Sequence, residues 1–181
     1  MKLSTLYIFY TIAICFAIAS LTFHILTYFP NLKTTDTSIT FLLGVAIFPS
    51  FITGIKSTQK LVDKNNPMGM WKDVLKGTPY YLKVLIILII PYVFFNFFYS
   101  LMYLTEGLSA DRLNDIYILT SKGKTVREIT EIEYFKYIAY EFRGISGHFI
   151  LFQLISIALI SSAININKGQ TATKKQEHIR T

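Results

Sequence analysis

The sequence predicts an all-α membrane protein with four transmembrane helices. Of its 181 residues, 52% are hydrophobic and 15% aromatic, which is too apolar for one soluble domain of this length. Four stretches carry no formally charged residue, at residues 3–32, 37–55, 84–105 and 144–167. Each has about the 20 residues that a helix needs to cross the hydrocarbon core. In lipid, a helix also satisfies its own backbone hydrogen bonds.

The first transmembrane helix is predicted over residues 3–29. Its start resembles a cleavable signal peptide, with Lys2, an apolar centre and Ala17 two residues before Ala19. The apolar stretch continues well past a typical signal core, so we expect this helix to be retained. The sole cysteine, Cys15, lies within it, which leaves no partner for an intrachain disulfide.

The second and third helices are predicted over residues 38–58 and 81–105. Gly44, Pro49 and Gly54 lower the helix propensity of the second, but neighbouring helices can repair the backbone of a membrane helix at such positions. We expect this helix to be kinked. Pro91 predicts a similar bend in the third.

The loop between these two helices contains a predicted interfacial helix. In the segment that follows Pro67, apolar residues share one face and charged residues the other. Trp71, Lys72 and Lys76 would anchor this helix at the level of the lipid headgroups. The alternative is that the same face binds a cytoplasmic protein.

Residues 106–143 are predicted to form a cap on the outer side of the membrane. The β-rich flanks of Lys122 and Gly123 predict a small β-hairpin. Thr130 and Glu133 have capping-box spacing and predict the start of an amphipathic helix. A separate fourth transmembrane helix is expected over residues 144–166. Residues 1–167 would then be one four-helix domain, and residues 168–181 a polar, frayed or disordered cytoplasmic tail.

Basic residues predict the orientation of the chain. With both termini in the cytoplasm, the cytoplasmic segments hold eleven Lys and Arg and the outer segments hold seven. This favours a multi-pass protein of the plasma (inner) membrane. We therefore interpret the net charge of +7 as a mark of topology and expect no nucleic-acid partner.

Two histidines within the apolar stretches are the strongest candidates for a ligand site. His24 and His148 would both lie roughly 6–7 Å inside the outer interface, from the rise of 1.5 Å per residue. The favoured interpretation is that each bonds to headgroups or water near the interface. Haem ligation by both is a weaker alternative, and no metal site is predicted, because zinc would need further ligands.

A second candidate site is a polar cluster on the outer side. Besides the two histidines it comprises Asn96, Glu106, Glu141 and Arg143, and it would bind a partner or a small ligand. Asn96 alone is more simply a hydrogen-bonding link between helices.

No catalytic residue is predicted. Ser146 and His148 are two positions apart on a helix, so their side chains point away from each other. We find no phosphate-binding loop and no metalloprotease helix motif. A small permease, with Asn96 and Gln153 lining its path, is an alternative with few polar residues to support it.

The segment "GKTVREITEIEYFKYIAYEFRGISGHF", residues 123–149, resembles a family of uncharacterised small multi-pass bacterial membrane proteins. The shared features are a Gly-Lys turn, an Arg-Glu-Ile-Thr start, a Tyr-rich helix and an Arg-Gly-x-Ser-Gly-His stretch where the chain reaches the membrane. The resemblance implies no activity. The expected function is therefore non-enzymatic contact with a protein partner or a second copy, as a subunit of a membrane assembly or as an immunity-type protein.

Overall fold

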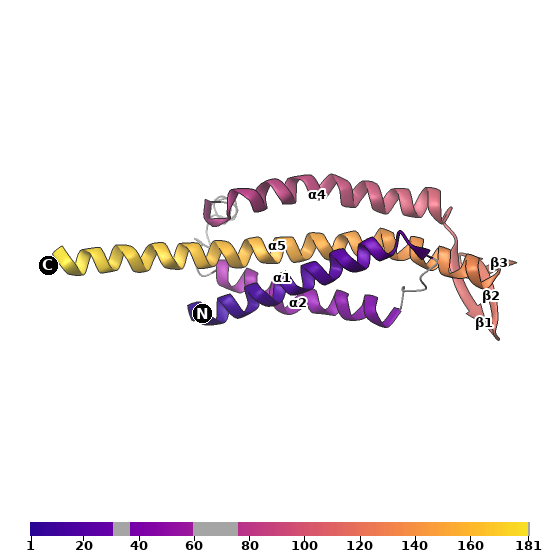
Figure 1. Ribbon diagram of the computed structural model, residues 1–181, viewed down its shortest axis with the longest axis horizontal. Coiled ribbons are helices and arrows are strands. Elements are labelled where there is room, and N and C mark those ends of the chain that lie inside the picture. Colours follow the sequence, from indigo (N-terminus) through magenta and orange to yellow (C-terminus); the bar gives the residue numbers. More distant parts are fainter. Residues whose placement is uncertain (31–36, 60–75, 181) are drawn as a thin grey trace. The chain divides into compact units, whose positions relative to one another are not determined.

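The structure is a computed structural model that describes residues 1–30, 37–59 and 76–180. The described chain is mostly helical, with one small antiparallel sheet (Figure 1). The elements in chain order are α1 (Leu3–Leu26), α2 (Thr37–Gln59), α4 (Tyr80–Tyr99), the π-helix η2 (Ser100–Leu104), β1 (Ser109–Leu113), β2 (Ile116–Ser121), β3 (Lys124–Glu128) and α5 (Glu131–Arg180).

The prediction of four long apolar helices is confirmed. Each of the four helices in the described residues has the length and the composition to cross a membrane. Pro49 lies inside α2 and Pro91 inside α4, and both helices continue past their proline. The predicted interfacial helix, with Trp71 and Lys72, lies outside the described residues. Lys76 is described and is exposed.

The prediction for the last part of the chain was wrong in one respect. The amphipathic helix, the fourth apolar helix and the polar tail were expected to be separate, but they form the single helix α5 of 50 residues. No proline interrupts it. Two of its glycines allow close approach to η2 and α4. A Cβ added to Gly144 would lie 3.3 Å from the Cβ of Ser100 on η2, and one added to Gly147 would lie 3.5 Å from Val93 on α4.

The sheet is also larger than predicted. The hairpin at Lys122 and Gly123 is present as β2–β3, but β1 adds a third strand in the order β1-β2-β3. The turn residues Asn114 and Asp115 have φ values of 47° and 66°, and Lys122 and Gly123 have 49° and 76°. Positive φ at both central residues is the mark of the tight turns that suit twisted hairpins.

The chain forms two compact units. The first comprises Met1–Ala17, Ala46–Leu88 and Phe152–Thr181. Its core contains two apolar clusters, one around Leu6 and Ile160 and one around Ala13 and Ile157.

Small residues bring the backbones together in the first unit. An added Cβ on Gly54 would lie 2.9 Å from the Cβ of Leu159, and one on Gly77 would collide with Ser162. Close approach through small residues is the usual way in which membrane helices pack, because burial from water does not drive them together in lipid.

The second unit comprises Ile18–Val45 and Ile89–Leu151 and contains the sheet. Strand β2 supplies the buried residues Ile118 and Leu119, whereas every residue of β3 is exposed. The ring of Tyr117 on β2 lies 4.8 Å from that of Tyr134 on α5. The sheet therefore rests on the start of α5, which supplies the support that an isolated hairpin lacks.

Candidate functional site

The most polar buried region of the second unit is centred on His24, in the last turn of α1. Its Nδ1 atom lies 2.7 Å from the Oγ atom of Ser146 on α5. Its Nε2 atom is hydrogen-bonded to the hydroxyl of Tyr92 on α4, and that hydroxyl lies 3.1 Å from the hydroxyl of Tyr28. A continuous chain of four polar side chains thus joins three helices.

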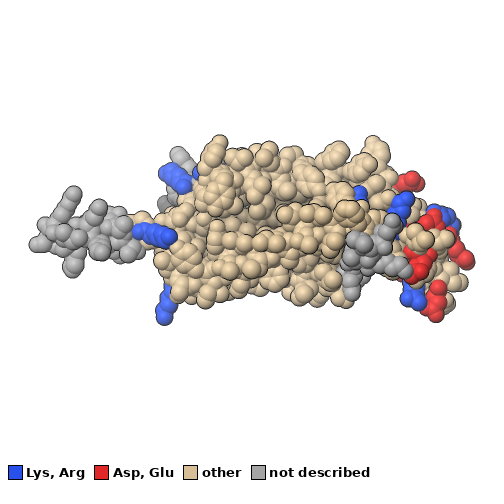
Figure 2. Space-filling view, in the orientation of Figure 1, with Lys and Arg blue, Asp and Glu red and all other residues tan. Residues whose placement is uncertain are grey.

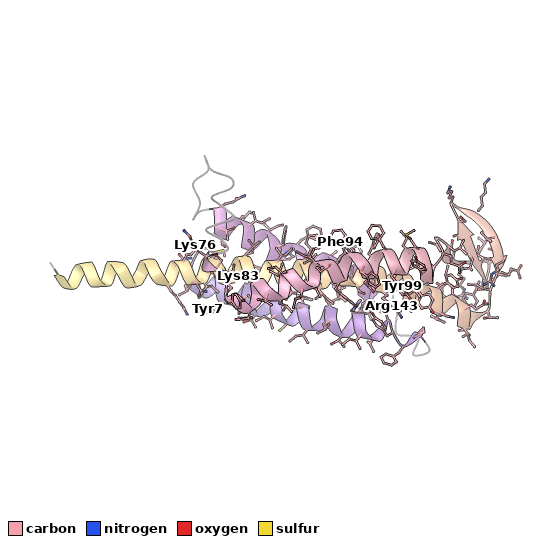
Figure 3. All side chains as sticks on the ribbon, turned by 90° about the horizontal axis from the view of Figure 1, so that it is seen from above. Tyr7, Lys76, Lys83, Phe94, Tyr99 and Arg143 are labelled. Atoms are coloured by element: carbon pink, nitrogen blue, oxygen red, sulfur yellow. The ribbon has the colours of Figure 1, made fainter. Side chains whose placement is uncertain are left out.

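Arg143 lies beside this chain and binds the end of α1. Its Nη2 atom donates to the carbonyl of Thr27 at 2.8 Å, just past the last residue of α1. Its guanidinium carbon lies 4.0 Å from the ring centroid of Tyr28 and 5.3 Å from that of Tyr140. A cation here complements the partial negative charge at the C-terminal end of a helix, and the rings attract it from their faces. Figure 3 marks Arg143 on α5.

Asn96 adds the link between α4 and α5. Its Nδ2 atom donates to the backbone carbonyl of Arg143 at 2.7 Å. A buried amide that bonds to a neighbouring helix is the structural link that the sequence favoured for this residue.

We refer to this group of side chains as the polar clamp. Its members come from three helices or from the turn after α1, and all belong to the second unit: His24, Thr27, Tyr28, Tyr92, Asn96, Arg143 and Ser146.

The structure brings together part of the predicted polar cluster. His24, Asn96 and Arg143 belong to the clamp. Glu141 instead accepts a hydrogen bond at 3.0 Å from the backbone N–H of Ala110 on β1, and Glu106 is exposed. Glu141 and Arg143 are two positions apart on α5, so their side chains leave the helix in different directions.

His148 is in a different setting from His24. Its Nδ1 atom lies 3.2 Å from the carbonyl of Gly144, one turn earlier, and its ring meets that of Phe97 at 5.4 Å edge-on. Both ring nitrogens of His24 already have partners. The two histidines therefore have different sets of partners in the structure. No group of three or more His, Cys, Asp or Glu that could hold a metal ion occurs among the described residues.

The pair of His24 and Ser146 has the residue types of a base and a nucleophile. A neutral imidazole has one donor and one acceptor nitrogen. If Ser146 donates to His24, then His24 donates to Tyr92. If Ser146 instead donates to the carbonyl of Arg143, 3.3 Å away, the donors and acceptors are reversed: Tyr92 donates to His24, and His24 donates to Ser146. The side chain of Ser146 is 0% exposed, so a substrate could reach it only if the helices separated. The arrangement described can hold helices together, but it does not present a nucleophile.

The sequence holds part of the signal for this pairing, because His24 and the first residues of the fourth apolar stretch are expected at the same depth. Ser146 lies about half a turn from His148 and faces α1 instead. Depth alone does not distinguish the two residues; the rotation of α5 about its own axis selects Ser146. Tyr28 and Tyr92 were not singled out, because tyrosine is common in membrane helices near the interface.

Two exposed ion pairs lie among residues 106–143. Arg112 pairs with Asp115 next to the first turn of the sheet. Arg127 on β3 donates to Glu133 on α5 at 3.1 Å. These bonds raise the pKa of Arg112 and of Arg127 above the ordinary value for arginine. Exposed pairs contribute little to stability, so their main effect is to fix the local geometry.

The predicted capping box is present at the start of α5. The N–H of Glu133 donates to the Oγ1 atom of Thr130 at 3.2 Å, and the N–H of Thr130 donates to the carboxylate of Glu133 at 3.0 Å. These reciprocal bonds pair two backbone donors at a helix start, where such groups lack partners within the helix.

Comparisons with models of known families, with curated proteins and with solved structures find no match to this chain.

Proposed function

We propose that this chain is a multi-pass protein of the bacterial plasma membrane that acts by contact with another protein, without catalysis. In this proposal both termini are cytoplasmic and the sheet lies outside. The excess of Lys and Arg in the cytoplasmic segments supports this orientation. The partner is either another subunit of a membrane assembly or, for an immunity-type protein, a membrane-active toxin.

The observation that carries the proposal is the set of exposed apolar side chains on the sheet. Leu113 is 57% exposed and Val126 is 54% exposed, and Ile116 is exposed opposite Leu113 in the register. Exposed apolar side chains on the transmembrane helices, such as Phe94 and Tyr99 on α4 (Figure 3), would face lipid. Those of the sheet would face water, where such groups mark contact sites if they form a patch.

The charges around these residues support contact through side chains. Figure 2 shows acidic and basic side chains gathered over the sheet. Strand β3 is an edge strand, and the shift in its register with β2 leaves Val126 without a paired residue. Bulges and charges on an edge strand disfavour the pairing of further strands. The sheet is therefore suited to binding through its side chains.

The polar clamp supports the same function indirectly. It links the end of α1 to the second half of α4 and to the turn of α5 that contains Arg143 and Ser146, all within the second unit. A sheet that rests on the start of α5 is then held by an ordered base, and preorganisation of this kind lowers the entropic cost of binding.

The test is site-specific photocrosslinking in native membranes. A photoreactive phenylalanine analogue is placed at Leu113 or Val126, and in a matched control at the exposed turn residue Lys122. We expect the same partner, identified by mass spectrometry, to crosslink from Leu113 and from Val126. The crosslink from either position should be lost when the residue at the other position is changed to Asp. Equal or absent crosslinking from all three positions would rule out this surface.

The two kinds of partner are distinguished by deletion of the gene. If the protein is of the immunity type, its loss increases sensitivity to a membrane-active toxin and leaves membrane complexes intact. If it is a subunit, its loss changes the size of a complex in mild detergent.

A further inference from the structure

A cavity of about 230 Å³ lies in the second unit between the end of α4 and the early turns of α5. Phe97, Ser100 and Leu101 line it from the side of α4 and η2, and Glu141 and Ile145 line it from α5. None of these residues belongs to the polar clamp. The cavity coincides with the π-helix, an irregularity that is frequent at functional sites.

Ser100 lines this cavity and carries a buried hydroxyl without a partner among the described residues. Its side chain is 2% exposed, and its Oγ atom has no hydrogen-bond partner among the described residues. The absence of a side chain at Gly144 leaves Ser100 its space, since an added Cβ would lie 3.3 Å from the Cβ of Ser100. A buried hydroxyl that lacks a partner is costly, and a ligand that bonds to it would offset this cost.

Glu141 places a negative charge at the same cavity. It is half-buried, and its Oε1 atom accepts the N–H of Ala110 at 3.0 Å. A carboxylate can accept further hydrogen bonds after this one. Within the part of the chain that the structure describes, no lysine or arginine forms an ion pair with it. Partial burial of this carboxylate lowers the local dielectric and strengthens its attraction for a cation in the cavity.

We propose that this cavity binds a primary ammonium group carried on a short alkyl chain. A primary ammonium has three N–H donors, so it can pair with the Glu141 carboxylate and the Ser100 Oγ atom at once, while the ring of Phe97 attracts its charge. A quaternary ammonium has no donor and leaves Ser100 unpaired. An uncharged apolar molecule leaves both groups unpaired.

The size of the cavity limits how much of the ligand it can hold. Its volume equals that of roughly eight water molecules, at about 30 Å³ each. This suffices for the ammonium group and a short segment next to it. Two sources supply this chemistry: a soluble primary amine and the headgroup of phosphatidylethanolamine. The lipid is a source because residue 144 begins an uncharged stretch and would lie at headgroup depth.

The test uses the full chain in nanodiscs of phosphatidylglycerol. In one arm, native mass spectrometry compares the retention of added phosphatidylethanolamine and phosphatidylcholine. In the other arm, equilibrium dialysis compares 2-phenylethylamine with its N-trimethyl analogue. We expect at least one of the two primary amines to bind about tenfold more tightly than its trimethylated counterpart, as the loss of a charge-assisted bond implies. The arm in which this occurs identifies the source.

Variants tie the binding to the cavity. Glu141→Gln keeps an oxygen for the N–H of Ala110 but removes the charge, and we expect binding to weaken by about tenfold. Ser100→Ala is the second variant and also weakens binding. Glu106→Gln is the matched control, because it removes a nearby exposed carboxylate that does not line the cavity.

Three results would overturn the proposal. The first is equal binding of the primary and trimethylated amines, and the second is no binding of either primary amine. The third is that Glu141→Gln binds the primary amine as tightly as the control Glu106→Gln does. If Glu141→Gln does not fold, the same comparison is made with Ser100→Ala.

Discussion

Replacing Arg143 by methionine tests whether the polar clamp holds the helices together. The change removes the hydrogen bond to the Thr27 carbonyl at 2.8 Å and the contact with the Tyr28 ring at 4.0 Å, but keeps an unbranched apolar chain of similar length. A hydrogen bond from a charged group contributes about 1.5–3 kcal/mol, and a partly desolvated cation–π contact about 0.5–2 kcal/mol.

These contributions are partly offset by the cost of burying the guanidinium. Arg143 is 9% exposed, and its Nε atom has no partner among the described residues. Burial of an incompletely paired charge is unfavourable, so removing the charge recovers part of the loss. We therefore expect Arg143→Met to lower the free energy of unfolding by about 2–3 kcal/mol. Arg143→Lys should fall between this variant and the original protein, because it keeps the charge but not the planar fork.

The assay is reversible unfolding in mixed micelles with increasing SDS, followed by circular dichroism. Lys122→Met is the matched control. It removes a positive charge from an exposed turn and should change the free energy of unfolding by less than about 0.5 kcal/mol. If the clamp acts as described, the double variant with Tyr28→Leu loses less than the sum of the two single losses, because the residues share a contact. A loss for Arg143→Met no larger than that of the control would refute the reasoning.

Three further predictions follow from other parts of the chain. Gly77→Ala should lower the free energy of unfolding by about 1–3 kcal/mol, because the added Cβ collides with α5. Gly169→Ala is the control, because its added Cβ meets no atom within 4 Å. Equal losses of stability in the two variants would contradict the close packing at Gly77. Thr130→Ala should remove about 0.5–2 kcal/mol by breaking the capping box, and hydrogen exchange should rise in the first turn of α5 and not in its middle. In a cysteine-free background, Lys56→Cys and Lys122→Cys should react with an impermeant maleimide from opposite sides of the membrane, and labelling from one side would contradict the proposed topology.

The long helices could be predicted because hydrocarbon thickness sets a minimum length for an uncharged stretch. All four predicted stretches became long helices. The continuity of α5 was missed, because the expected boundary at residue 144 depended on the change from charged to uncharged residues after Arg143. Such a change marks where a chain enters lipid, but it does not end a helix.

Strand β1 shows a second limit of local sequence signals. Its sequence, Ser-Ala-Asp-Arg-Leu, contains few residues that favour strands. It is a strand because β2 pairs with it across the tight turn at Asn114 and Asp115. Asn and Asp tolerate the left-handed region better than most residues, so this dipeptide was the one available signal, and it was weaker than the Lys-Gly turn that was recognised.

The polar clamp could be predicted only in part. Asn96 and His24 stand out as polar groups within apolar stretches and Arg143 as a charge next to one, whereas Tyr92 and Ser146 are ordinary residues in such a setting. What makes them partners is the rotation of each helix about its own axis. That rotation depends on packing against the neighbouring helices, which one sequence does not reveal.

The unequal burial of the helices has a consequence for how this chain can change in evolution. In their apolar stretches, 67% of the residues of α5 are buried but only 17% of those in the helix that contains α4. An exposed position on α4, such as Phe94 or Phe95, accepts almost any apolar residue. A larger side chain at Gly147 would meet α4, and one at Ser156 would meet the filled core. Divergent copies of this gene should therefore accumulate substitutions on α4 and preserve α5, even though both helices read as equally apolar.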